Sequence, residues 1–254
     1  MHVKYAIVTG ASRGLGESVA KLFMEQGIHV IGLSRRENKA LHNHAEKQQA
    51  SYTHVTCDLG QTEQVKTAYS NISEHLPTDG LDTLYLINNA AVVEPIDQAM
   101  RIDPDDLVNH VHINTIAPMI LANLLLQKAV QIDVPLICAT VTSGAADRPT
   151  YGWSAYCSTK AAMDIYTKTV ALEQEKLQTD NKVIAFSPGI MDTNMQTTIR
   201  QTREDAFVDR ETFRHYKAEN MLRDTETVAS VLIDILLDKA NIINGKIYKA
   251  NDYL

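Results

Sequence analysis

The sequence predicts an α/β fold in which helices cover both faces of a parallel, doubly wound sheet of about seven strands. Short apolar runs alternate with longer segments of helical periodicity along the whole chain. Three glycines follow the first apolar run, directly before the first helical segment. The 254 residues, 44% hydrophobic and 22% charged, are enough for one large core. We therefore expect one domain over residues 1–254, with ligands at the carboxyl ends of its strands.

Seven apolar runs are predicted to form the strands, and the most apolar of them to be buried on both faces. They span residues 6–8, 30–33, 54–56, 83–87, 136–141, 183–186 and 246–248. Between them, helical patterns occupy residues 15–26, 37–49, 62–75, 104–130, 155–178 and 225–238. The alternation stops at residues 192–222, a polar stretch rich in arginine. This stretch is either a solvated helical excursion or a mobile lid over substrate.

The charge balance argues against several classes of partner. Lys and Arg number 24 and Asp and Glu 31, a net charge of −7 without a basic block. Nucleic acids and anionic membranes are therefore unlikely partners on electrostatic grounds, and we expect a small molecule instead. The three cysteines are few and lack metal-ligand spacing, as is typical of a reducing compartment. Met1 leads almost directly into the first apolar run, and we expect no signal peptide, no membrane-spanning run and a cytoplasmic location.

The first turn carries a nucleotide-binding pattern. Gly10, Gly14 and Gly16 lie between an apolar strand and an amphipathic helix. Such glycines allow a tight turn and bring backbone amides and a helix N-terminus to a pyrophosphate, although a glycine-rich turn also occurs as plain structure. The candidate cofactor residues of this turn are Gly10, Ser12, Arg13, Gly14, Leu15 and Gly16.

The end of the second predicted strand indicates which nucleotide is used. An NAD site usually has an acid about 20 residues past the glycines, for the ribose 2′-hydroxyl. This chain has Arg35 and Arg36 instead. Together with Arg13 they are suited to a 2′-phosphate, which favours NADPH. The alternative is that they are ordinary surface arginines beside Glu37.

Two further strand ends supply cofactor candidates. Asp58 could accept a hydrogen bond from the adenine amino group, with Leu59 against the ring; alternatively, Asp58 caps a helix. After the fourth strand, Asn89 could tie neighbouring strands together, and the small Ala90 would let the chain approach the cofactor. Here the alternative is a turn-forming pair of asparagines, Asn88 and Asn89.

A tyrosine and a lysine four residues apart indicate proton transfer. Tyr156 and Lys160 share one helix face, so the ammonium can favour the phenolate and lower the pKa of the phenol. The hydroxyl of Ser143, from another segment, could hold the oxygen that is protonated. Each residue also has an ordinary structural interpretation, as a core tyrosine, a solvated lysine and a turn serine. The neighbouring Cys157 has no paired base, and we expect it to be a small buried residue.

In order and spacing these motifs resemble the short-chain dehydrogenases/reductases of the single-domain Rossmann type. The resemblance runs nearly end to end, through residues 9–16, Asp58, residues 88–90, Asn114, Ser143, Tyr156, Lys160, Pro188, Gly189 and Thr193. It implies that Tyr156 is the acid/base and that Lys160 binds the nicotinamide ribose. It also implies that Ser143 orients the carbonyl and that Asn114 supports a water relay, unless Asn114 only bonds within its helix. Pro188, Gly189 and Thr193 would border the nicotinamide carboxamide.

One position departs from the family pattern. Ala91 stands where the family usually has glycine, which would narrow the cofactor floor slightly. The family commonly dimerises through the helices that contain Asn114 and Tyr156. A homodimer or homotetramer is therefore expected, and the apolar run at residues 121–130 is compatible with it.

Residues 142–157 and 187–196 resemble sepiapterin reductases and bacterial benzil reductases more narrowly. Both groups use NADPH to reduce one carbonyl of a vicinal dicarbonyl or α-functionalised ketone. The substrate candidates are Ser143, Tyr156, Trp153, Met195 and Asp252. Trp153 would form an aromatic wall and Met195 an apolar surface. Asp252 lies where sepiapterin reductases have a C-terminal carboxylate that pairs with the amino edge of the pterin. The alternative interpretations are that Trp153 only packs its loop and that Asp252 is a solvated acid in the C-terminal tail.

The sequence therefore predicts an NADPH-dependent carbonyl reductase without a metal. The alternatives are an NADP(H)-dependent alcohol dehydrogenase for another substrate class and a non-enzymatic NADP(H)-binding sensor. A sensor of this fold usually lacks the serine, tyrosine or lysine, and this chain has all three.

Overall fold

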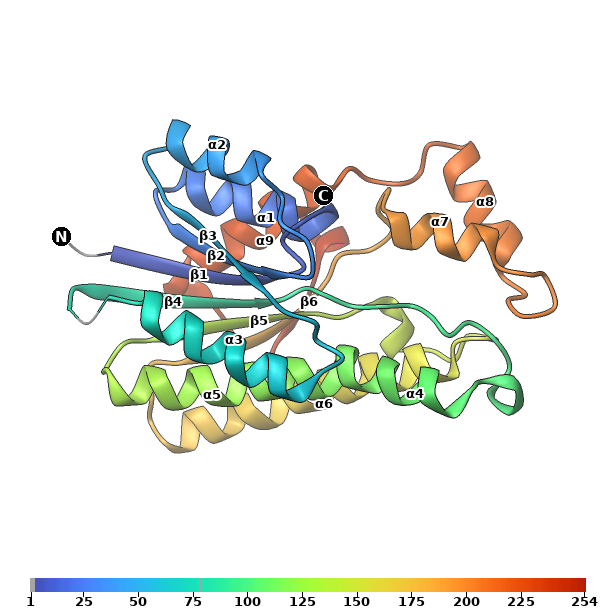
Figure 1. Ribbon diagram of the computed structural model, residues 1–254. Coiled ribbons are helices and arrows are strands. Elements are labelled where there is room, and N and C mark those ends of the chain that lie inside the picture. The colour runs from blue at the N-terminus through green and yellow to red at the C-terminus, as the bar shows by residue number, and fades with distance from the viewer. Residues whose placement is uncertain (1–2, 78) are drawn as a thin grey trace.

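A seven-stranded parallel sheet forms the centre of the protein in a computed structural model that describes residues 3–77 and 79–254 (Figure 1). The strand order is β3-β2-β1-β4-β5-β6-β7. Every neighbouring pair is parallel. The order reverses between β1 and β4, so the crevice for a ligand opens at the carboxyl ends of these two strands. The predicted doubly wound α/β fold is confirmed.

All seven predicted strands are present. The central ones are almost fully buried, because helices cover both faces of the sheet. The strands are β1 (Val3–Thr9), β2 (His29–Ser34), β3 (Tyr52–Thr56), β4 (Leu81–Asn88), β5 (Leu136–Val141), β6 (Lys182–Ser187) and β7 (Ile247–Lys249).

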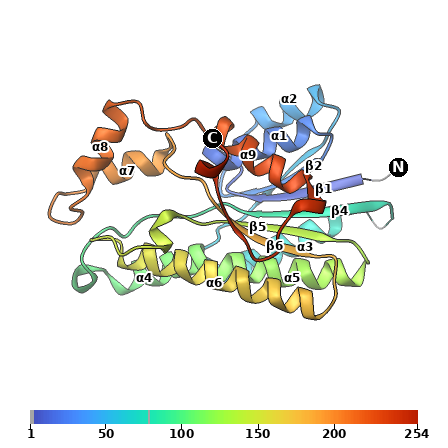
Figure 2. The same cartoon turned by 180° about the vertical axis from the view of Figure 1, so that it is seen from behind.

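Two layers of helices enclose the sheet (Figures 1 and 2). The first layer consists of α1 (Gly14–Glu25), α2 (Ala40–Lys47) and α9 (Thr225–Leu237). The second consists of α3 (Thr62–His75), α4 (Pro104–Val111), α5 (Ala117–Gln131) and α6 (Ser154–Lys176). Each layer closes a separate hydrophobic core against the sheet, one through α1 and α9 and the other through α3, α5 and α6.

After a loop that follows β4, the chain forms one continuous helical run before β5. Helices α4 and α5 are joined by the π-helical turn η2 (His112–Ile116). Among the described residues, this 28-residue run, Pro104–Gln131, is the one helix long and apolar enough to cross a membrane. The expectation that no membrane-spanning run occurs thus meets one helix that could span a membrane by length and composition alone. However, 56% of its most apolar window is buried inside the protein, as in the core helix of an α/β domain.

Residues 192–222 form a helical excursion outside the two layers. It contains α7 (Asn194–Gln201) and α8 (Arg210–Ala218), which lie beside the carboxyl edge of the sheet (orange in Figure 1). No residue of α8 is buried. The helical excursion expected from the sequence is thus present, and its position beside the site is compatible with the lid interpretation. The remaining elements are the short 3-10 turns η1 (Ala99–Arg101), η3 (Gly144–Ala146), η4 (Lys239–Asn241) and η5 (Ala250–Asp252).

Candidate active site

The glycine turn after β1 forms a cradle for a phosphate group. Gly10 and Gly14 have φ angles of 70° and 59°, which residues with a side chain rarely adopt. A Cβ on Gly16 would lie 2.4 Å from the carbonyl oxygen of Gly10, so only glycine permits this close packing. Helix α1 then begins without a side-chain cap. Its first amides therefore point at the turn without a capping side chain, which fits the pyrophosphate of a dinucleotide.

Asn89 joins the two strands on either side of the crevice. Its Nδ2 donates to the carbonyl oxygen of Thr9 at 2.9 Å. The backbone amides of Asn89 and Ala90 both donate to the Thr9 hydroxyl at 3.0 Å. The predicted tie between neighbouring strands is thus confirmed, and it holds the end of β4 against the glycine turn.

The arginines at the end of β2 are free to meet an anion. Arg35 and Arg36 are both exposed. In the described part of the chain, neither side chain takes part in an ion pair. The same loop is tied to the glycine turn, because Asn38 Nδ2 donates to the carbonyl oxygen of Ser12 at 3.2 Å. Two unpaired cations therefore stand close to a phosphate cradle.

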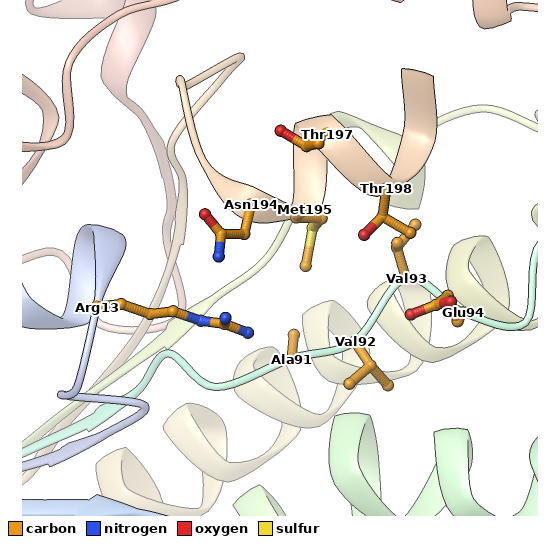
Figure 3. A pocket seen from close by; sticks show the side chains of 9 residues that line it. All are labelled: Arg13, Ala91, Val92, Val93, Glu94, Asn194, Met195, Thr197 and Thr198. Carbon is orange, nitrogen blue, oxygen red and sulfur yellow. The ribbon is translucent and has the colours of Figure 1, made fainter. Parts of the chain in front are cut away.

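Arg13 lies elsewhere than expected. Figure 3 shows its side chain reaching into a cavity, toward Ala91 and Met195. The cavity has a volume of about 420 Å³ and is lined from both sides, by Arg13, Ala91, Val92, Val93, Glu94, Asn194, Met195, Thr197 and Thr198. The sequence predicts that Arg13 binds the same 2′-phosphate as Arg35 and Arg36. In the structure its side chain instead points into the cavity.

Asp58 forms a local turn rather than a helix cap. Its Oδ1 accepts from the amide of Gly60 at 3.0 Å. The residue that precedes α3 is Gln61, so the capping alternative is not what the structure contains. Leu59 is half-buried against the core under α3. A role of either residue in adenine binding stays a prediction.

Tyr156 and Lys160 both face inward from the first turns of α6. Their exposed fractions are 6% and 4%. The Lys160 ammonium donates to the carbonyl oxygen of Val141 at 2.8 Å and lies 5.7 Å from the centre of the Tyr156 ring. The Tyr156 hydroxyl makes a weak contact, 3.9 Å, with the sulfur of Met195. The acid/base candidate therefore faces a residue that lines the cavity.

Burial controls the titration of this pair. Burial raises the pKa of Tyr156 to about 12, although the Ser143 hydroxyl acts in the opposite direction. Burial also lowers the pKa of Lys160 to about 8, opposed by the nearby Asp164. The pKa of Tyr156 is therefore raised in this structure, whereas the spacing of Tyr156 and Lys160 predicts that the lysine lowers it. The physical reason is that a phenolate loses more hydration on burial than it gains from an ammonium held by a backbone carbonyl.

Ser143 stands at the end of β5 with its hydroxyl proton available. Its Oγ accepts from the amide of Ala145 at 3.2 Å. An accepted bond leaves the hydroxyl hydrogen free to donate to a substrate oxygen. The Ser143 hydroxyl also lowers the pKa of Tyr156, so the two hydroxyl groups are near each other; that both contact one substrate oxygen stays a prediction.

Asn114 is buried in the π-helical turn η2 and makes more than a helix-internal bond. Its Oδ1 accepts from the amide of Val92 at 2.9 Å, and its Nδ2 donates to the carbonyl oxygen of Val92 at 2.8 Å. The alternative that Asn114 only serves its own helix is therefore wrong. Asn114 fixes the segment after β4 that lines the cavity.

Helix α7 lines the cavity from the other side with Asn194, Met195, Thr197 and Thr198. Thr193, Pro188 and Gly189 precede this helix in the chain. Thr193 precedes α7, and its Cγ2 is the atom nearest to a Cβ built on Gly14, at 3.8 Å. Pro188 and Gly189 follow β6, and the atom nearest to a Cβ built on Gly189 is Asn251 Oδ1, at 3.1 Å. The carboxyl ends of β1, β5 and β6 thus bring these candidates to one edge of the sheet. Their contact with a carboxamide stays a prediction.

An aromatic cluster covers Tyr156. Trp153, 7% exposed, stacks on Phe207 with ring centres 4.8 Å apart, and it meets Tyr156 edge-on at 5.2 Å. Phe213 closes the cluster at 5.5 Å from Trp153. The indole nitrogen of Trp153 has no hydrogen-bond partner among the described residues. Trp153 therefore both packs its loop and walls the position next to the phenol.

Phe207 and Phe213 are two residues of the site that were not expected from the sequence. A signal existed, because two of the four phenylalanines of the chain lie in the polar segment 192–222. An aromatic side chain in a polar excursion indicates an inward-facing side. Outside the cluster, Arg203 pairs with Asp97 at 2.9 Å, which joins this segment to the loop after β4.

Within residues 3–77 and 79–254, neither Asp252 nor Cys157 makes a hydrogen bond to the Tyr156 hydroxyl or the Lys160 ammonium. Cys157 nevertheless packs against the hydrophobic cluster that contains Tyr156. Asp252 is exposed in the turn η5, so its contact with substrate stays a prediction. Cys157 is half-buried rather than fully buried, and its Sγ lies 3.6 Å from the carbonyl oxygen of Arg148. Among the described residues, no group of three or more His, Cys, Asp or Glu side chains could hold a metal ion.

Comparison with known proteins decides the family. The description of short chain dehydrogenases matches residues 4–204. The chain belongs to the short-chain dehydrogenase/reductase family. It is 35% identical to a benzil reductase ((S)-benzoin forming) of Bacillus cereus, over 92% of this chain and 94% of the relative. It is 29% identical to a sepiapterin reductase of Xenopus tropicalis, over 98% of this chain and 94% of the relative.

A solved structure of the family has the same architecture. A short-chain dehydrogenase/reductase of Saccharomyces cerevisiae superposes with a TM-score of 0.81 at 28% identity, covering 98% of this chain and 96% of its own. Members of this family bind a nicotinamide cofactor, and the glycine cradle of this short-chain dehydrogenase/reductase fits one. The protein is therefore an oxidoreductase that acts on a carbonyl or alcohol group.

Proposed function

We propose that this short-chain dehydrogenase/reductase is an NADPH-dependent reductase of activated ketones, in particular of one carbonyl of a vicinal diketone or of a sepiapterin-like α-functionalised ketone. The observation that carries the proposal is the geometry of Tyr156, which is buried beside Lys160 and whose hydroxyl contacts Met195 in the cavity wall. A phenol whose pKa is about 12 keeps its proton at neutral pH. This is the proton that reduction delivers to the carbonyl oxygen; the raised pKa makes the phenol a weaker acid, and the Ser143 hydroxyl acts against that rise.

The residues have separate tasks in this reaction. Bound NADPH supplies a hydride for the carbonyl carbon. The Ser143 hydroxyl donates a hydrogen bond to the carbonyl oxygen, and Tyr156 transfers its proton to that oxygen. The Lys160 ammonium holds the ribose and takes part in returning a proton to the tyrosine.

The aromatic cluster supports an aryl or pterin ketone as the substrate class. Trp153, Phe207 and Phe213 present ring surfaces next to Tyr156, on which a planar conjugated substrate can pack. The similarity to benzil and sepiapterin reductases supports the same class. The unpaired Arg35 and Arg36 support NADPH over NADH, and the reducing cytoplasm is the proposed location.

The substrate class is tested with the purified protein and NADPH. We expect NADPH consumption with benzil, sepiapterin and simple diketones, and little with steroids. Deoxybenzoin is the matched control, because it keeps both phenyl rings of benzil and lacks the second carbonyl. Equal rates with benzil and deoxybenzoin would exclude a requirement for a vicinal carbonyl. No turnover of any carbonyl compound would favour the NADP(H)-binding sensor instead.

A homodimer or homotetramer is also part of the proposal. The outer face of α6 exposes Ile165 and Leu172, with 62% and 54% of their surface accessible. A shallow hollow of this face, shared with α5, is lined by Met119, Ser158, Ala161, Ala162, Ile165, Tyr166 and Thr169. Apolar surface of this kind supports self-association. Light scattering should give a multiple of 28.2 kDa, and Ile165→Glu should shift it toward the monomer. A wild-type monomer at all concentrations would contradict the proposal.

A further inference from the structure

His110 is a fully buried histidine under the active site. It lies on α4 with no exposed surface. Its ring meets the Tyr156 ring edge-on, with the ring centres 6.3 Å apart. A histidine with no access to water is costly unless both ring nitrogens have partners.

The partners of the two nitrogens select one tautomer. Nδ1 lies 2.6 Å from the carbonyl oxygen of Glu94, which can only accept, so Nδ1 carries the proton. Nε2 lies 3.0 Å from Nδ2 of Asn114, which can only donate, so Nε2 is the acceptor. The orientation of the Asn114 amide is fixed independently by its two bonds to the backbone of Val92. The imidazole is therefore neutral, with its proton on Nδ1.

The same ring also contacts the helix that carries the catalytic pair. Nε2 lies 3.1 Å from the hydroxyl of Thr159, on the residue before Lys160. Because Nε2 is an acceptor, the Thr159 hydroxyl donates its single proton to it, and the carbonyl oxygens of Ala155 and Tyr156, at 2.9 and 3.1 Å, are the competing acceptors. One side chain thus joins three segments, namely the cavity wall after β4, the π-helical turn and the start of α6. A buried network whose polar members are all paired is rigid.

The charges around His110 keep it neutral. Burial lowers its pKa and the Lys160 ammonium on α6 adds to the lowering, while the backbone carbonyls of Glu94 and Ala155 act in the opposite direction; the net shift is downward. The segment after β4 presents the backbone carbonyl of Glu94 to the ring. A proton on Nε2 would turn this acceptor into a donor facing the Asn114 amide, and the link would break.

We propose that His110 is a positioning residue of the reaction. It holds residues 92–94 and Asn114 in register with the turn of α6 that presents Tyr156 and Lys160. The inference rests on the proposed carbonyl reduction, and it assigns His110 no contact with substrate or cofactor. Because small displacements of a proton donor are costly in rate, loss of this link should appear in kcat.

Three substitutions separate the two ring nitrogens. His110→Gln can keep an acceptor near the Nε2 position, His110→Asn can keep a donor near the Nδ1 position, and His110→Leu removes both at similar volume. We expect His110→Leu to lower kcat by roughly 10- to 100-fold without weakening NADPH binding, measured by fluorescence titration. Glutamine should restore more activity than asparagine, because it can still accept from Asn114. His75→Leu is the control, since the exposed His75 bonds only a carbonyl of its own helix, at 2.7 Å from Asn71.

Two results would overturn the positioning role. One is an unchanged kcat in all three variants. The other is a loss of kcat that merely follows losses of NADPH affinity and melting temperature, which indicates a structural role only.

A measurement without substrate tests the tautomer. In the ¹⁵N-labelled protein, NMR should find the His110 ring protonated at Nδ1 and unprotonated at Nε2 at neutral pH. An Nε2-protonated tautomer or an imidazolium would overturn the inference, whatever the enzyme turns over. If the tautomer is as expected but the wild-type protein reduces no carbonyl compound, then the proposed function fails, and the positioning role in it fails as well.

Discussion

Tyr156→Phe is expected to abolish nearly all turnover while leaving NADPH binding intact. The variant lacks the one proton that Tyr156 delivers to the carbonyl oxygen, and positioned general acids contribute about 10²- to 10⁴-fold in rate. The fold should tolerate the change, because the hydroxyl is buried and makes a weak contact with the Met195 sulfur at 3.9 Å. The measurements are kcat with benzil and NADPH affinity by fluorescence.

Tyr151→Phe provides the matched control for this experiment. It removes the same hydroxyl from a tyrosine five residues upstream that is 50% exposed. Its kcat should stay at the wild-type value. A phenylalanine variant at position 156 with substantial activity would reject Tyr156 as the acid, and Ser143 would then be the next candidate.

The fold could be predicted from the sequence because its signals are local. Each strand is an apolar run, and each helix has its own periodicity, so a parallel sheet with helices on both faces follows from their alternation. Helix 104–130 was expected as one element, and the structure has it as α4, η2 and α5 over Pro104–Gln131. The π-helical turn had no local signal in the sequence; it contains Asn114, whose side chain bonds the distant backbone of Val92 as well as His110 in the preceding turn.

The candidate site could be predicted only where a motif carried it. The glycine turn and the hydrogen bonds of Asn89 depend on backbone geometry that glycine and asparagine favour. The residue types at these positions therefore predict both features from the sequence. The partners of His110 cannot be predicted in this way, because Glu94 and Thr159 meet it only after the chain folds. The direction of the Tyr156 pKa shift is another example. Helical spacing indicated the nearby lysine, but the degree of burial depends on Trp153 and on the distant Phe207.

Replacing Arg35 and Arg36 by alanine should raise KM for NADPH far more than KM for NADH. In the proposed complex the two guanidinium groups bind the 2′-phosphate that distinguishes NADPH from NADH. A hydrogen bond to a charged group contributes about 1.5–3 kcal/mol, which is roughly 10- to 100-fold in affinity, and exposure places these bonds at the lower end. We therefore expect the double variant to lose roughly 100-fold in kcat/KM with NADPH, through KM, and to change little with NADH.

Two controls separate a specific contact from general electrostatics in this experiment. Lys47→Ala removes an exposed positive charge from the last turn of α2 and should not change the cofactor preference. Salt should weaken NADPH binding to the wild-type protein more than to the double variant, because screening acts on the charge pair that the variant lacks. Equal increases of KM for both cofactors would mean that the arginines support the loop rather than the phosphate. An NAD site usually carries an acid after its second strand, and this chain has Arg35 and Arg36 there instead. Neither guanidinium group has an ion-pair partner among the described residues. In the proposed complex, the 2′-phosphate of NADPH supplies the anion that pairs with them.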